Sequence, residues 1–112
     1  MENTRQLKIS RQIQKDLGEI IRLRGMATYG GAMVTVSEVR VTQDLSIAKI
    51  YLSIFPSAKA EETLKRIVAE TKPLRAELGK RVRHQLRIVP ELHFYIDETL
   101  DKLAQIDELL KK

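Results

Sequence analysis

The side chains of this sequence that could perform chemistry are few and scattered. Its two histidines, His84 and His93, are nine residues apart on different predicted elements, a spacing that matches no specific metal site. Because there is no cysteine, the sequence offers neither a thiolate ligand for zinc nor a disulfide. Helix capping accounts for the neighbouring carboxylates of Asp97, Glu98 and Asp101. The sequence therefore predicts no metal site.

Asp44 and Ser46 are the remaining candidates for a nucleophilic or acid–base pair. Both residue types are common in turns, where they make local hydrogen bonds, and no base for a serine nucleophile is evident. The glycines are equally uninformative, since Gly30-Gly31 is not part of a phosphate-binding loop. We expect a protein that is not an enzyme and that uses no cofactor and no small-molecule substrate.

Basic residues, in contrast, are clustered, within a net charge of +5. Residues 1–24 carry six basic and three acidic side chains, and residues 72–87 carry six basic side chains against Glu77 alone. Residues 25–71 are neutral overall, and residues 88–112 are net acidic. Clustered positive charge attracts polyanions, so the two blocks predict nucleic-acid binding, unless each is only a solvated helix face.

The first block lies on a predicted helix from about Thr4 to Arg24. Asn3 or Thr4 can cap its start, and Gly25 lies just past its end. Its apolar residues recur at the helical period, with the basic residues on the opposite side. The apolar residues of this helix are Ile9, Ile13, Leu17 and Ile20.

A basic amphipathic helix can also lie on a membrane, but this one lacks Trp and Phe. Residues 1–10 are polar and lack the apolar core of a signal peptide, and no apolar run approaches the ~20 residues that span a bilayer. We expect a cytoplasmic protein with no membrane contact.

Three strands are predicted by alternation of apolar and polar residues. The first, within residues 32–42, changes phase at Ser37-Glu38, which indicates a bulge. A turn at residues 43–44 leads to the second strand, which Pro56 ends, and a third strand lies within residues 86–97. Tyr51 and Tyr95 fall on the sheet face away from the core, where they could stack on bases or simply be favourable strand residues.

The segment from residue 57 to about 85 has a helical pattern that Pro73 interrupts. We expect two helices, or one kinked helix, meeting near Thr71-Lys72. A last short helix begins at Asp97 and has its own apolar stripe. The fold class is therefore α+β, a single domain over residues 1–112 of order α-β-β-α-α-β, with a three-stranded sheet and a short C-terminal helix.

Residues 39–53 read VRVTQDLSIAKIYLS, and residues 74–94 read LRAELGKRVRHQLRIVPELHF. These two segments resemble the ribosome-binding factor A family. The basic N-terminal helix and the ending over residues 105–110 are also similar to that family. The resemblance implies a type II KH domain. The sequence has no G-x-x-G loop, and the A-x-G kink of the family is replaced by Glu70-Thr71-Lys72 followed by Pro73.

The resemblance implies a factor that binds the free 30S subunit and its 16S rRNA during late assembly, helps rRNA processing, and is released with help from an assembly GTPase. It would act as a monomer by binding alone. Phosphate contacts are then expected in the first block from Arg5, Lys8, Arg11, Lys15 and Arg22. In the second block they are expected from Lys72, Arg75, Lys80, Arg81, Arg83 and Arg87.

Two other classes of binding protein remain open. A protein-interaction module could use an exposed strand edge, with only incidental RNA affinity. A DNA-binding regulator is less favoured, because no helix-turn-helix or ribbon signature is present. Salt dependence separates the first alternative from RNA binding, since counterion release makes RNA affinity fall steeply with salt.

Overall fold

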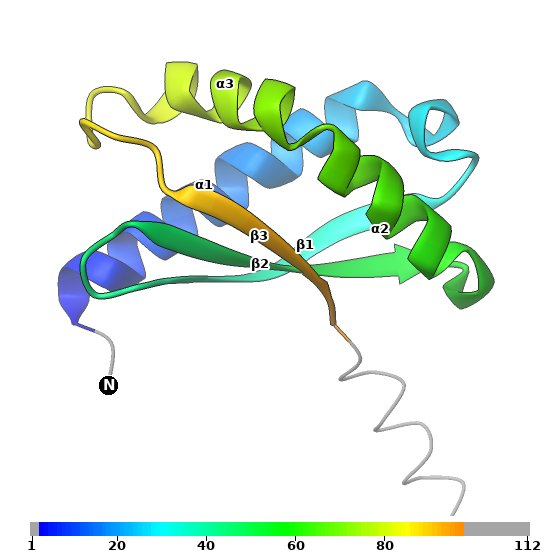
Figure 1. Ribbon diagram of the computed structural model, residues 1–112, viewed down its shortest axis with the longest axis horizontal. Helices are drawn as coiled ribbons and strands as arrows, with labels where there is room; N and C mark the ends of the chain where they lie inside the picture. Colours follow the sequence, from blue (N-terminus) through cyan, green and yellow to red (C-terminus); the bar gives the residue numbers. More distant parts are fainter. Residues whose placement is uncertain (1–2, 98–112) are drawn as a thin grey trace, which may run out of the picture.

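The computed structural model describes residues 3–97. Within this range the elements follow in the order α1 (Thr4–Arg24), β1 (Met33–Val41), β2 (Ile47–Phe55), α2 (Ala60–Ala69), α3 (Thr71–Val82) and β3 (Glu91–Ile96) (Figure 1). This confirms the predicted order α-β-β-α-α-β. The predicted C-terminal helix lies outside the described residues.

The three strands form one sheet in the order β1-β2-β3. β1 and β2 pair antiparallel, whereas β3 returns through α2 and α3 to pair parallel with β2. Val36 pairs with Leu52 and Glu38 with Tyr51, so Ser37 is the extra residue of a bulge. The change of phase in the sequence therefore predicted the bulge correctly.

The core lies between the sheet and the helices, which cover one of its faces. Ala48, Ile50, Leu52 and Ile54 of β2 point into it, as their alternation predicted. α1 packs along β1 and against α3, while α2 lies over β3. The fully buried branched side chains contribute about 1.5–3 kcal/mol each by leaving water; they include Ile13, Leu17, Ile21, Ile67, Leu74, Leu78 and Val82.

Local side chains define both ends of α1. The side-chain oxygen of Asn3 accepts a hydrogen bond from the backbone N–H of Gln6 at 2.8 Å, and the Gln6 side chain accepts one from the Asn3 N–H at 3.0 Å. This capping box satisfies two backbone donors that the first turn leaves free. Gly25 ends the helix with a φ of 80°, a conformation that favours glycine.

A single residue, Glu70, separates α2 from α3. Its backbone N–H donates to Arg66 and Ile67, which closes α2, and its carbonyl accepts from Leu74, which opens α3. Pro73 lies in the first turn of α3, where a backbone N–H has no acceptor within the helix, so the absence of this group in proline costs no hydrogen bond. The break was expected near Thr71-Lys72 and lies one residue earlier.

Polar side chains of α1 cover part of the outer edge of β1. The amide of Gln14 donates to the carbonyl of Ser37 at 3.1 Å, and that of Gln6 donates to the carbonyl of Val41 at 3.0 Å. The hydroxyl of Ser10 accepts from the N–H of Val41 at 3.3 Å. These bonds occupy backbone groups that would otherwise be open to a further strand.

Candidate nucleic-acid interface

The first basic block forms a ridge on the outer side of α1. All five predicted residues are exposed, opposite the buried stripe that begins at Ile9. None of the five makes a hydrogen bond or ion pair with another residue of the range 3–97. Their charges are therefore available to an external anion such as a phosphate; the residues are Arg5, Lys8, Arg11, Lys15 and Arg22.

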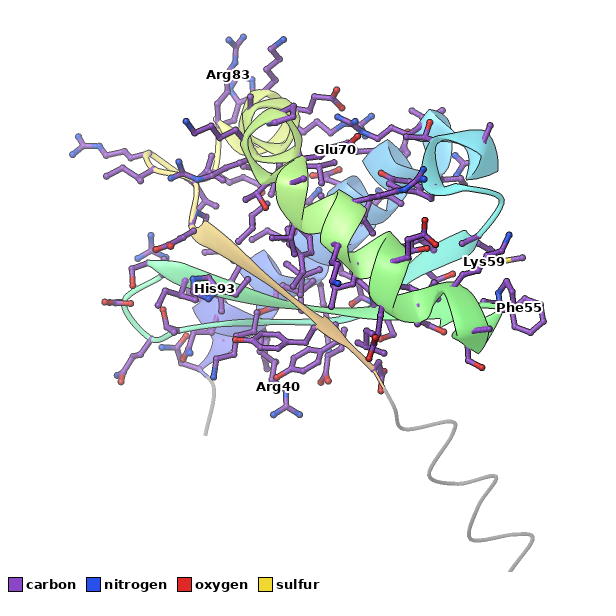
Figure 2. All side chains as sticks on the ribbon, turned by 45° about the vertical axis from the view of Figure 1, so that its right-hand side comes forward. Arg40, Phe55, Lys59, Glu70, Arg83 and His93 are labelled. Carbon is purple, nitrogen blue, oxygen red and sulfur yellow. The ribbon has the colours of Figure 1, made fainter. Side chains whose placement is uncertain are left out.

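The second block divides into two groups. Lys72, Lys80, Arg83 and Arg87 are exposed and have no ion pair within the described part of the chain. Figure 2 shows Arg83 on the α3 side of the molecule, pointing away from the sheet. These four side chains remain candidates for phosphate contacts.

The other two residues of the second block bind within the protein. Arg75 donates to the carbonyls of Val89 and Pro90, the latter at 3.2 Å, and so holds the segment that leads into β3. Arg81 on α3 lies 3.3 Å from the carboxylate of Glu19 on α1. Both guanidinium groups therefore have a structural partner within the protein.

The fold brings the end of the second block close to the first. A shallow groove of about 560 Å³ is lined by four of the α1 cations together with Gln85, which follows α3. Lys72 and Arg75 line a different groove, between α3 and the start of β3, with Gly79 and Val89. The eleven predicted residues therefore do not meet in one groove.

Sequence reasoning missed Glu19 and Gln85, which connect the two blocks. Neither residue carries a local signal, because its role depends on the packing of α1 against α3. The sequence also predicted no separate role for Arg24, although this basic residue at the end of α1 forms ion pairs with Glu70 and Glu77.

The remaining polar candidates have structural surroundings. Hydrogen bonds from Ser46 and Thr42 to the carboxylate of Asp44 lower the pKa of Asp44. The same hydrogen bonds fix the turn between β1 and β2. Burial raises the pKa of Tyr29. His84 is exposed, while His93 lies 3.4 Å from Glu91. Among residues 3–97, no three histidine or carboxylate side chains gather in a way that would hold a metal ion.

The arrangement of cations thus favours binding of an extended polyanion over any reaction. No helix among the residues described is both long and apolar enough to cross a membrane.

The element order, the parallel pairing of β3 and the two basic helices define a type II KH-like domain with a candidate nucleic-acid surface. The family model described as Ribosome-binding factor A matches residues 5–110. The chain belongs to the ribosome-binding factor A family. The family model and the curated relatives carry the name of a ribosome-binding factor.

Similar proteins cover almost the whole chain. Ribosome-binding factor A of Flavobacterium johnsoniae is 49% identical over 113 residues, which cover 98% of this chain and 85% of that protein. Ribosome-binding factor A of Cytophaga hutchinsonii is 39% identical over 112 residues, covering 100% and 84%. The resemblance found in the sequence is thereby confirmed.

Two structures from Thermus thermophilus show the same fold. The crystal structure of its ribosome-binding factor A has a TM-score of 0.70 and 25% identity, covering 81% of this chain and 94% of that one. A homology model of that factor, fitted into a cryo-EM map of a 30S–RbfA complex, has a TM-score of 0.65 and 27% identity. It covers 79% of this chain and 90% of that one.

Proposed function

We propose that this chain binds the free 30S ribosomal subunit, with the α1 ridge and the exposed cations of α3 contacting phosphates of the 16S rRNA. The observation that carries the proposal is the row of five exposed cations on α1 that have no partner in residues 3–97. Family membership supports it, as does the Thermus thermophilus factor, whose model was fitted into a map of its complex with 30S.

Binding at these residues would act through position and shape. Phosphate contacts orient a protein on RNA but carry no sequence information, so selectivity would come from the folded shape of the rRNA. In this proposal the protein is a cytoplasmic monomer that assists late 30S maturation and 16S rRNA processing. An assembly GTPase would promote its release, and no covalent step is needed.

The proposal is tested by co-sedimentation of the purified protein with small subunits, large subunits and assembled ribosomes over a salt series. We expect selective binding to free small subunits that weakens steeply as salt rises, because phosphate contacts release counterions. Equal binding to all three particles would reduce the activity to nonspecific RNA affinity. Absence of binding at low salt would contradict the proposal.

Charge reversal tests the α1 ridge directly. The double variant Arg11→Glu/Lys15→Glu should lose small-subunit binding at moderate salt. Each lost contact should make log K depend less steeply on log salt, reducing the magnitude of the slope by about one. Lys65→Glu is a matched control for Lys15→Glu. It makes the same charge change at an exposed helical lysine outside both blocks. If the double variant binds like the wild type, the ridge is not the contact surface.

The alternative protein-interaction module would need an open strand edge. The outer edge of β1 is partly covered by α1, whereas the outer edge of β3 is open within the described residues. The backbone N–H groups of Glu91 and Asp97 donate to β2, and backbone groups alternate in direction along a strand. The backbone groups of Leu92, Phe94 and Ile96 therefore point away from β2. A partner strand there would bind through backbone hydrogen bonds, so the complex would lose far less affinity with salt. The same salt series therefore distinguishes the two functions.

A further inference from the structure

A stacked pair of tyrosines lies on the face of the sheet that the helices leave open. Tyr51 and Tyr95 are register partners on β2 and β3, with ring centroids 5.5 Å apart and ring planes inclined by 27°. Tyr95 is 41% exposed. A strand tyrosine needs no ligand to explain it, but two rings in contact on an open face offer an aromatic surface.

The neighbouring row of the same face is basic. Arg40, Lys49 and His93 are cross-strand partners on β1, β2 and β3, two residues along each of β2 and β3 from the tyrosines. Figure 2 shows Arg40 on the side of the sheet away from α2 and α3. Lys49 makes no hydrogen bond or ion pair with any residue of the described range.

We propose that this face binds single-stranded RNA, with a base stacked on Tyr95 and the adjoining phosphate held by Lys49. Every base has a π-face, so aromatic stacking is tolerant of sequence. A duplex hides its base faces, which excludes it from this surface. The surface is separate from the α1 ridge, and the proposal does not depend on binding to the ribosomal subunit.

Charge on this face predicts how such binding responds to salt. Glu38 lies 3.2 Å from Arg40 and offsets its charge, and Glu91 lies 3.4 Å from His93, so this face carries little net positive charge. Affinity would rest mainly on stacking, with about one phosphate contact, and would depend on salt much less than binding at the five-cation ridge does. This difference separates the two surfaces experimentally.

The tyrosines provide their own reporter, because the chain has three tyrosines and no tryptophan. The third, Tyr29, is buried, and its hydroxyl has no hydrogen-bond partner among the described residues, so Tyr29→Phe is a mild change. In that background all tyrosine emission comes from Tyr51 and Tyr95. Titration with a short oligouridylate should quench this emission, whereas an RNA duplex of the same length should quench it far less.

Variants measured with a labelled oligouridylate assign the contact. Tyr95→Leu should lose about tenfold or more in affinity, because it removes the stacking ring, while Tyr95→Phe should retain binding. Lys49→Ala should weaken binding by several-fold. Lys65→Glu, at an exposed lysine of α2 outside both basic blocks, should leave oligouridylate binding unchanged.

Two outcomes would overturn the assignment. One is emission that does not respond to the oligouridylate, and the other is equal affinity of Tyr95→Leu and the wild type. In the first case, an emission change on deletion of residues 98–112 would assign the face to the chain's own C-terminal residues. Failure of small-subunit binding alone would contradict only the proposed function.

Discussion

The guanidinium of Arg24 lies 3.0 Å from the carboxylate of Glu70, the single residue between α2 and α3. Its other terminal nitrogen lies 3.3 Å from Glu77 on α3. Arg24 is the last residue of α1 and its side chain is only 21% exposed. The end of one basic helix is thereby tied to the start of the other, which fixes the relative position of their outward-facing cations.

Loss of this tie should lower the stability of the fold. Arg24→Ala leaves two neighbouring carboxylates without their shared cation, so we expect the free energy of unfolding to fall by about 1–3 kcal/mol. Urea unfolding followed by circular dichroism measures the change. Arg22→Ala, at an exposed position without an ion pair among residues 3–97, should stay within about 0.5 kcal/mol of the wild type. Equal losses for both variants would contradict a specific role for Arg24.

Two residues of the second block should separate stability from binding. Arg75→Ala frees the carbonyls of Val89 and Pro90, so it should destabilise the fold by about 1–2 kcal/mol in urea unfolding. Lys80→Ala should change stability by less than about 0.5 kcal/mol but weaken small-subunit binding in the salt series. A Lys80→Ala variant with unaltered binding would remove this residue from the interface.

Two glycines, one inside α1 and one at its end, should respond oppositely to alanine. A Cβ on Gly18 would meet Val36 at an ordinary distance of 3.9 Å, so Gly18→Ala should stabilise by about 0.5–1 kcal/mol through helix propensity. Gly25 has φ 80° and ψ 162°, so Gly25→Ala should cost about 1–3 kcal/mol. Thermal unfolding of the two variants checks both signs, and a stabilising Gly25→Ala would contradict the cap geometry.

Asp44 should make stability depend on pH in the acid range. Its pKa is lowered in the folded state by the hydroxyls of Ser46 and Thr42, so its contribution is fully present above the unfolded pKa of about 3.9. That contribution is lost as the pH falls through the folded pKa. The melting temperature of Asp44→Asn should therefore lie below that of the wild type at neutral pH, with a difference that shrinks below about pH 4. A difference independent of pH would show that the charge of Asp44 is irrelevant.

Features that depend on neighbouring residues could be predicted from the sequence. Alternation predicted the buried side of β2, and its change of phase predicted the bulge at Ser37. The cap at Asn3, the end at Gly25 and the helix break before Pro73 also follow from local backbone chemistry. These elements form where expected because each is stabilised within a few residues of its own position.

The division of the basic residues could not be predicted in the same way. Arg75 and Arg81 flank the apolar stripe of α3, but their partners Pro90 and Glu19 become neighbours only after β3 and α1 have packed. Whether a cation faces solvent or another part of the chain is thus decided by tertiary contacts. Composition could identify the two blocks but not which of their members pair within the protein.

Because a single residue separates α2 from α3, an insertion or deletion there would change which residues of α3 face solvent. Each residue added to or removed from a helix rotates the remaining turns by about 100° and shifts them by about 1.5 Å along the axis. An insertion beside Glu70 would therefore turn Lys80 and Arg83 away from their present direction while burying polar groups in place of Leu74 and Leu78. The junction sets the rotational phase of α3, so its length should tolerate change far less than its amino-acid identity does.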